Sequence, residues 1–165
     1  MRPLALIAAL AISGPAAGAD YGIQGVALGM NEGRVKQQFP SAHCRALEWQ
    51  SKAADRRCDD SRISVAGAEA SITVYLRRDA VQALDLRFNT RDLGRIFAHF
   101  KTLYGAPQSE GPETIERGDR PPREVFKAHW AAGQDNAVLS SQPERKRSTI
   151  NVWRGDFAQE IYRTD

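Results

Sequence analysis

The chain has 165 residues, of which 23 are Lys or Arg and 20 are Asp or Glu, so its formal net charge at pH 7 is only +3. A nucleic-acid-binding protein would carry a larger and clustered basic excess, and we therefore expect no nucleic-acid partner. Hydrophobic residues make up 42% of the chain, which is ordinary for a globular protein. These values predict one soluble domain with a hydrophobic core of its own.

Residues 1–19 have the layout of a secretory signal peptide. A positive charge near the start is followed by an uncharged apolar run over residues 4–12 and by a small-x-small cleavage signal, Ala-Gly-Ala, at 17–19. The apolar run is too short for a transmembrane helix, which needs roughly 20 residues. We expect a mature, soluble single domain, residues 20–165, in the periplasm or outside the cell. Because Asp20 stands where a lipoprotein would have Cys, no lipid anchor is predicted there.

Cys44 and Cys58 are the two cysteines of the chain. In an oxidising compartment an even number of cysteines is typical of disulfide bonding, so a bond between the two is predicted. It would close a loop of about 15 residues and contribute roughly 3 kcal/mol. The alternatives are two buried reduced thiols, or a metal site that adds His43 and Asp59. That metal site lacks the paired spacing of structural zinc sites, and we predict neither a metal nor a cofactor.

The first half of the mature chain combines one helix with several strands. Asn31 is typical of a helix N-cap and Pro40 ends a helix, so a helix is predicted over residues 31–39. Alternation of apolar and polar residues then predicts strands. The predicted strands lie around residues 47–49 and over residues 62–66, 72–76 and 84–88. The charged stretch 52–60 is predicted to be a loop.

The second half begins with the strongest helical pattern of the chain. After Asn89 or Thr90 as N-cap, apolar residues form one stripe at helical period, and Gly105 followed by Pro107 ends the helix. The stretch 109–122 is rich in Gly, Pro and charge and is predicted to be a loop with at most one short strand. Three strands and a last short helix are predicted over residues 125–130, 137–141, 150–153 and 156–162.

Each half therefore contains a helix, an irregular segment and a three-stranded meander. The predicted fold class is α+β, with an antiparallel sheet built from two meanders and two main helices on one face. The same order of elements in residues 29–88 and 89–154 suggests a tandem α-β-β-β repeat. Residue identity between the halves is poor, so the sequence leaves the repeat open.

Two short segments resemble parts of small exported bacterial proteins. The segments are 28–30 (Leu-Gly-Met) with Val35, 39–40 (Phe-Pro) and Cys44, and 104–107 (Tyr-Gly-Ala-Pro) ahead of Trp130. Together with the order of elements they resemble the β-lactamase-inhibitor-protein-like architecture, which is shared with small outer-membrane-assembly lipoproteins. This resemblance implies a sheet with helices on one face and a binding function. It implies no particular contact residues, and the lipid-bearing cysteine of the lipoproteins is absent.

The sequence contains no recognisable catalytic constellation. His43, His99 and His129 occur in unrelated contexts, and no Gly-x-Ser-x-Gly elbow is present. We therefore expect a non-enzymatic binding or accessory protein of the bacterial cell envelope. The alternative is a small envelope hydrolase that uses scattered carboxylates or histidines, and a cleft containing His43, Asp59 and Asp60 would favour it.

Two surfaces are predicted to bind a partner. Tyr75 and Trp153 lie opposite apolar neighbours and form an aromatic patch on the outer face of the sheet, unless a loop or terminal segment covers them. The basic run Arg145, Lys146 and Arg147 is either a solvated turn or a patch for an acidic partner. The expected partner is an envelope protein or an anionic component of the envelope.

Overall fold

The computed structural model describes residues 20–163, so the predicted signal peptide, residues 1–19, lies outside the described residues. Ten strands and three α-helices form within this range, together with one 3₁₀ turn. The strands are β1 (Gly22–Ile23), β2 (Val26–Ala27), β3 (His43–Ala46), β4 (Arg56–Val65), β5 (Ala68–Arg77), β6 (Ala80–Asn89), β7 (Ser109–Arg117), β8 (Arg120–Ala132), β9 (Asp135–Ser141) and β10 (Arg147–Arg154). The helices are α1 (Glu32–Gln38), α2 (Leu93–Tyr104) and α3 (Phe157–Glu160), and the 3₁₀ turn is η1 (Thr90–Asp92).

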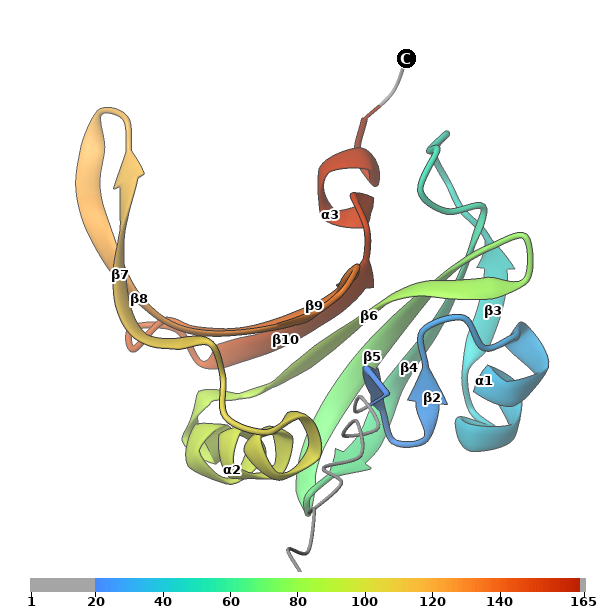
Figure 1. The fold of residues 1–165 in the computed structure, drawn as a ribbon, viewed down its shortest axis with the longest axis horizontal. Helices are drawn as coiled ribbons and strands as arrows, with labels where there is room; N and C mark the ends of the chain where they lie inside the picture. The colour runs from blue at the N-terminus through green and yellow to red at the C-terminus, as the bar shows by residue number, and fades with distance from the viewer. Residues whose placement is uncertain (1–19, 164–165) are drawn as a thin grey trace, which may run out of the picture.

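Eight strands form one antiparallel sheet in the order β3-β4-β5-β6-β10-β9-β8-β7, and β1 and β2 form a separate ribbon (Figure 1). Each of α1 and α2 is followed by a meander, β3–β6 in the first half and β7–β10 in the second. The meanders meet at their last strands, where β6 and β10 pair antiparallel. The strand order is therefore symmetric about this central pair. The predicted order of helix and then meander is present in both halves, but each meander has four strands rather than three.

Helices α1 and α2 pack on the same face of the sheet, as predicted, and α3 lies on the opposite face (Figure 1). Val35 of α1 and Ile96 and Phe100 of α2 are fully buried there. The sheet residues beneath them alternate with residues of the other face, as antiparallel strands require. We call this other face the open face. The open face includes Arg57, Asp59, Tyr75, Ala83, Asp85, Lys127, His129, Val138, Asn151 and Trp153.

Two helix ends follow the capping residues predicted from the sequence. The Asn31 side chain accepts a hydrogen bond of 2.9 Å from the backbone N–H of Arg34, and α1 begins at the residue after this cap. The Asn89 side chain likewise accepts from the N–H of Arg91 at 3.0 Å and caps η1. Gly105 ends α2 with a φ of 84°, a left-handed conformation that glycine adopts without strain. The predicted ends at Asn31 and Gly105 are confirmed, whereas Asn89 caps the 3₁₀ turn η1 and not α2, whose N-cap residue Asp92 forms no side-chain cap hydrogen bond.

The predicted disulfide is also confirmed. Cys44 and Cys58 are bonded, and they are register partners in the β3–β4 pair. Cys58 is 1% exposed and belongs to the main core, against which Cys44 packs. The bond therefore attaches the short edge strand β3 to the core side of the sheet.

The charged stretch 52–60, predicted as a loop, lies largely in strand β4. Its charged side chains on the open face are paired. Arg57 Nε donates to Asp59 Oδ2 at 2.8 Å, and the Thr73 hydroxyl donates to Asp59 Oδ1 at the same distance. Charge is compatible with a strand here because the paired side chains face solvent while Cys58, which lies between them in sequence, faces the core.

Two other predicted elements are wrong. The segment around residues 47–49 is not a strand, because Leu47 and Trp49 pack into a second, smaller apolar cluster on the open face. The predicted loop 109–122 forms most of the β7–β8 hairpin. Pro112 is tolerated in that hairpin because β7 is an edge strand, where only one side of the backbone is hydrogen-bonded within the sheet.

Candidate functional site

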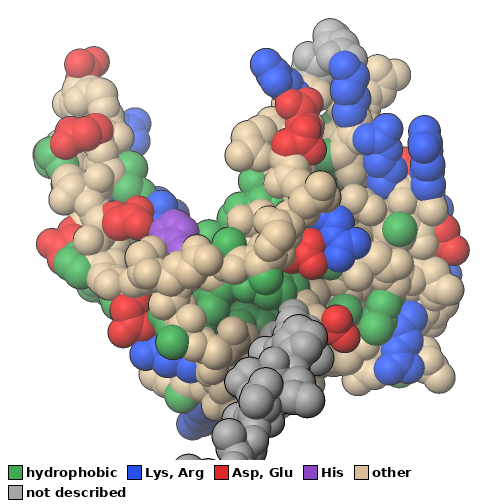
Figure 2. Space-filling model, in the orientation of Figure 1, with side chains coloured by type: hydrophobic (Ala, Val, Ile, Leu, Met, Phe, Trp, Pro, Cys, Tyr) green, Lys and Arg blue, Asp and Glu red, His purple; other side chains and the backbone are tan. Residues whose placement is uncertain are grey.

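The open face carries a groove between two projections. One projection is the β7–β8 hairpin and the other is α3, and the curved strands β8, β9 and β10 run between them (Figure 1). The volume of the groove is about 490 Å³. Figure 2 shows the hollow between the two projections, with hydrophobic side chains on its floor. We call this hollow the open-face groove.

The floor of the groove is a row of side chains from four adjacent strands. Asp85 is the register partner of Asn151, Asn151 of Val138, and Val138 of His129. Register partners in an antiparallel sheet stand side by side on the same face. The pairing of β6 with β10 thus brings residues from both halves of the chain into one site.

One wall of the groove is apolar and comes from the C-terminal segment. The ring of Phe157 in α3 lies 5.3 Å from the ring of Tyr75. Trp49 fixes the same segment, because its Nε1 donates to the Ile161 carbonyl oxygen at 2.8 Å and its ring stacks on Tyr162 at 5.6 Å. The short C-terminal helix predicted from the sequence is therefore present as α3, held against the sheet as an aromatic wall.

The floor contains one half-buried acid, Asp85. Asn151 Nδ2 donates to Asp85 Oδ1 at 2.8 Å. Burial raises the pKa of the Asp85 carboxyl, and the hydrogen bond from Asn151 and the charge of Arg87 lower it in part. Within residues 20–163 no donor is hydrogen-bonded to the second oxygen, Oδ2.

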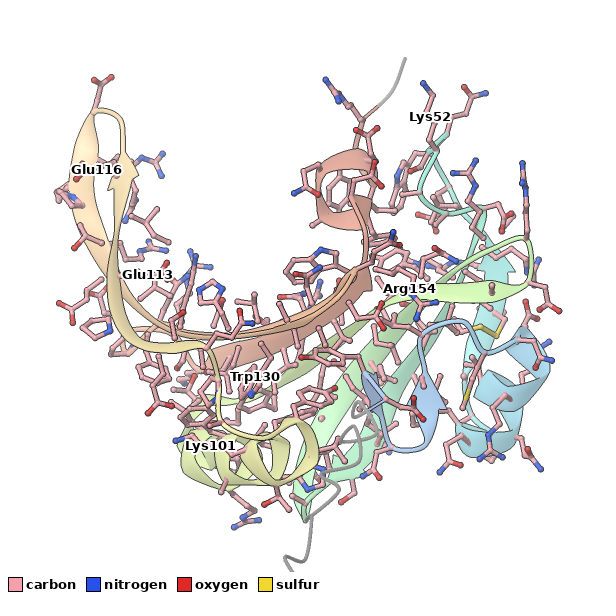
Figure 3. All side chains as sticks on the ribbon, viewed as in Figure 1. Lys52, Lys101, Glu113, Glu116, Trp130 and Arg154 are labelled. Carbon is pink, nitrogen blue, oxygen red and sulfur yellow. A yellow bond between two sulfur atoms is a disulfide. The ribbon has the colours of Figure 1, made fainter. Side chains whose placement is uncertain are left out.

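The opposite side of the groove carries Lys127 and His129 from β8, and both contact Glu113 of β7. Lys127 Nζ lies 3.1 Å from Glu113 Oε2, and His129 Nε2 lies 2.9 Å from Glu113 Oε1. The hydrogen bonds from His129 and Lys127 lower the pKa of the Glu113 carboxyl. Figure 3 shows Glu113 where the β7–β8 hairpin bends away from the rest of the sheet. The positive charge on this side of the groove is thus matched inside the protein.

The two predicted aromatic residues lie on the open face, but they do not form an exposed patch. Tyr75 is only 5% exposed because Phe157 covers it, so the expected exposure of Tyr75 is wrong and the alternative, cover by a terminal segment, is confirmed. Trp153 is half-buried, packs against the same cluster and lines the groove. A binding role for Trp153 stays a prediction.

The predicted basic residues lie elsewhere. Arg145 and Lys146 are in the turn that leads from β9 into β10, Arg147 begins β10, and all three are exposed. Thr90 holds this turn, since its N–H donates to the Lys146 carbonyl oxygen at 2.9 Å and its hydroxyl to that of Arg145 at 2.7 Å. The turn and Trp153 are at opposite ends of β10, so the structure does not bring the two predicted surfaces together. The basic patch stays a separate prediction.

The residues that would favour a hydrolase do not share a cleft. His43 and Asp59 are register partners on β3 and β4, and Asp59 is held by Arg57. Asp60 points to the opposite face, is 6% exposed, and accepts a hydrogen bond from the backbone N–H of Arg62. The open-face groove contains none of His43, Asp59 and Asp60.

The alternative metal site is not formed either. The two cysteine sulfurs lie within 4.8 Å of a Glu32 carboxylate oxygen, but they are bonded to each other and are not free thiolates. Glu32 is already held by Arg56 at 2.6 Å and by Lys36 at 2.7 Å. His43 and Asp59 stand on the open face, away from the cysteines.

Sequence reasoning missed most of the groove. The sequence patterns assign no role to Asp85, Asn151 or Lys127, and they place His129 in a context unrelated to those of the other histidines. Alternation along β6 and β10 does place Asp85 and Asn151 on a polar face. It does not reveal that these two strands are neighbours, and only that pairing creates the site.

None of the helices in the described part of the chain is long and apolar enough to cross a membrane. Comparison of the chain with known protein families, with curated proteins and with solved structures found no match. The resemblance to β-lactamase-inhibitor-protein-like proteins therefore stays an expectation, and function is argued from the groove.

Proposed function

We propose that the mature chain is an exported binding protein that acts through the open-face groove. The observation that carries this proposal is the groove itself, about 490 Å³ in volume, with a sheet floor, an aromatic wall and a few polar groups. Ligand sites in proteins are typically concave hollows of roughly 300–1,000 Å³ that are mostly apolar and contain a small number of placed polar groups. The open-face groove has each of these properties.

The partner we infer is a segment of another envelope protein. The groove is open between its two projections, so a loop or an extended segment can enter it (Figure 2). Aromatic side chains are enriched where proteins bind proteins, and Trp153 and the 73% exposed Tyr162 provide them at the groove. The binding function implied by the resembling architecture agrees with this proposal.

Export is part of the proposal and rests on two features. The sequence of residues 1–19 is typical of a signal peptide. The Cys44–Cys58 bond is typical of proteins that work in oxidising compartments. Both support a location in the periplasm or outside the cell.

A small hydrolase is the alternative, and the lining of the groove argues against it. His129 and Glu113 form a 2.9 Å pair that resembles a base with its orienting carboxylate. Covalent acyl transfer also needs a nucleophile within reach of that base. The described residues that line the groove include no Ser, Thr or Cys, so the site favours binding.

Site-specific photo-crosslinking in the cells that make the protein tests this proposal. Benzoylphenylalanine replaces either Tyr162, at the edge of the groove, or Arg91 in η1, whose side chain is 77% exposed. We expect a discrete protein adduct from position 162 and none from position 91. Adducts at neither position, or the same adducts at both, would contradict a partner in the groove.

A second pair of variants links the adduct to the groove. Val138→Trp fills part of the floor without adding charge, whereas Ser71→Trp places the same side chain on the open face of β5, outside the groove lining. The adduct from position 162 is expected to disappear in Val138→Trp and to persist in Ser71→Trp. Equal loss in both variants would mean that the sheet, and not the groove, is what the partner needs.

A further inference from the structure

Within residues 20–163, the Asp85 carboxylate in the open-face groove forms no ion pair within 4.0 Å. We propose that the partner segment inserts a Lys or Arg side chain into the groove and that its cationic end binds the carboxylate of Asp85. This proposal rests on the proposed function of the groove, and it names the chemical group that the groove recognises.

Charge complementarity is the first reason for a cation. Two charged side chains, Asp85 and Lys127, and the imidazole of His129 line the floor and the β8 side. Glu113 contacts both Lys127 and His129, which leaves those two with a partner. Arg87 lies two residues from Asp85 on β6, is exposed, and forms no ion pair with it within 4.0 Å. An incoming cation therefore meets an acid, Asp85, that is held in no ion pair, while Lys127, the basic residue of the groove lining, is already paired with Glu113.

The hydrogen bonding of Asp85 is the second reason. Asn151 donates to Oδ1 at 2.8 Å and holds the carboxylate in the floor, while Oδ2 has no donor within residues 20–163. A half-buried carboxylate is only partly solvated, so a donor that arrives with a positive charge gains a charge-assisted hydrogen bond. An anionic or purely apolar side chain would bury this oxygen without a partner.

The aromatic wall is the third reason. Trp153 and Tyr75 are both register partners of Ala83, which lies two residues from Asp85 on the same face of β6. Trp153 is therefore a diagonal neighbour of Asp85 across the β6–β10 pair. The alkyl stems of Lys and Arg pack along apolar and aromatic surface while their charged ends reach a polar group, and aromatic rings also attract cations. The groove offers an aromatic surface for the alkyl stem and the Asp85 carboxylate for the charged end.

Selection of peptides provides a test in which the partner need not be identified. The folded mature protein, residues 20–165, is used to select binders from a library of random peptides displayed on phage. Selected peptides are synthesised, and their affinities are measured for the wild type and for Val138→Trp. We expect peptides that bind the wild type, lose at least tenfold in affinity for Val138→Trp, and contain a Lys or Arg.

The contact with Asp85 is then measured by a double-mutant cycle. Replacing the basic residue of a peptide by norleucine is expected to weaken binding to the wild type at least tenfold, and binding to Asp85→Asn less than twofold. Asp85→Asn keeps the acceptor for Asn151 and the shape of the floor, and a thermal melt confirms that it is folded. Asp59→Asn is the matched control, because Asp59 lies on the same face outside the groove. It should leave peptide affinity unchanged.

The outcomes separate this inference from the proposed function. Peptides that require an open groove but carry no basic residue, or that lose equal affinity on norleucine replacement in the wild type and in Asp85→Asn, would overturn the cationic anchor and leave the binding groove standing. Failure to select any peptide, or peptides that bind Val138→Trp as tightly as the wild type, would overturn both.

Discussion

The fold shifts the pKa values of two acids, Glu32 and Asp85, in opposite directions. Arg56 Nε lies 2.6 Å and Lys36 Nζ 2.7 Å from the Glu32 carboxylate, and these hydrogen bonds lower its pKa from 4.5 to about 2. The contact joins the start of α1 to β4. Burial instead raises the pKa of Asp85, for which Asn151 is the only hydrogen-bonded side chain among residues 20–163. We therefore expect Glu32 to contribute to stability, and we have proposed Asp85 as a binding residue.

The substitution Glu32→Gln tests the first of these two roles. A carboxyl whose folded-state pKa is lowered stabilises the fold above its ordinary pKa of 4.5, and the contribution is lost as the pH falls toward about 2. Because the Arg56 side chain is 41% exposed and solvent weakens the pair, we expect a loss of only about 1–2 kcal/mol at pH 7. Urea denaturation at pH 7 and near pH 2 measures it. The exposed Glu69→Gln is the control, and a difference that does not shrink at low pH would contradict the assignment.

Asp85→Asn should show the opposite sign. A carboxyl whose folded-state pKa is raised destabilises the fold when it is ionised, and this cost fades as the pH falls toward its ordinary value of 3.8. We therefore expect a higher Tm than wild type at pH 7 and a smaller gain near pH 4. Thermal melts across this range provide the measurement. A variant that is less stable at pH 7 would show that Asp85 is retained for the fold rather than for binding.

At the scale of elements, the C-terminal segment and the 47–55 loop together cover part of the open face. They build the second cluster with Tyr75 and Ala83 from the sheet. This cluster leaves the sheet exposed toward β8 and β9, and the edge of the cover becomes the wall of the groove. The wall of the groove therefore depends on the short helix α3 and on the few contacts that attach it to the sheet.

Phe157→Ala tests how firmly this wall is anchored. Phe157 is 7% exposed and packs on Tyr75, so its removal should cost about 3 kcal/mol, as for other buried aromatic residues. Gln159→Ala, on the exposed side of α3, should change stability by less than about 0.5 kcal/mol. Chemical denaturation compares the two variants. Equal effects would mean that α3 is not packed as described.

The disulfide can be tested at the same scale, because β3 pairs only with β4. The double variant Cys44→Ser, Cys58→Ser should lose about 2–4 kcal/mol, since the bond constrains the unfolded chain. Wild type unfolded with and without reductant is the control and should show the same difference. Intact mass of the exported protein that reports two free thiols would refute the bond.

At the scale of the whole molecule, the β6–β10 pair joins two similar halves into one sheet. Leu84 and Leu86 of β6 and Ile150 and Val152 of β10 are fully buried along this pair, beneath α1 and α2. In an isolated meander the last strand would be an unpaired edge of the sheet. In the whole molecule β6 and β10, the two last strands, pair with each other. We expect the halves to unfold together as one cooperative unit.

Ile150→Ala in β10 tests this expectation. Removing a fully buried side chain should cost about 2–4 kcal/mol. Hydrogen exchange should show the same loss of protection for the slowest amides of β5, in the first half, and of β9, in the second. Thr149→Ala, whose side chain faces the opposite side of the sheet, is the control. Loss of protection confined to β7–β10 would show two independent units.

Local sequence patterns predicted the elements whose ends are marked by capping residues or glycine. The start of α1 followed from Asn31 and the end of α2 from Gly105, since capping and left-handed backbone conformations depend on single residues. Asn89 caps the 3₁₀ turn η1, and α2 begins only at Leu93. The β7–β8 hairpin was missed because its residues are polar, with Gly and Pro among them. It forms because each strand has a neighbour to bond, a property of the sheet and not of the segment.

The α+β class, the N-cap of α1, the end of α2, the alternation of the strands and the pair of cysteines follow from the amino-acid sequence, because they depend on residues that are close in sequence or few in number. The pairing of β6 with β10, the cover of Tyr75 by α3 and the position of Asp85 beside Asn151 in a groove follow from the three-dimensional fold. Strand pairing and helix docking depend on which distant surfaces bury the most apolar area together, and no local pattern states that sum.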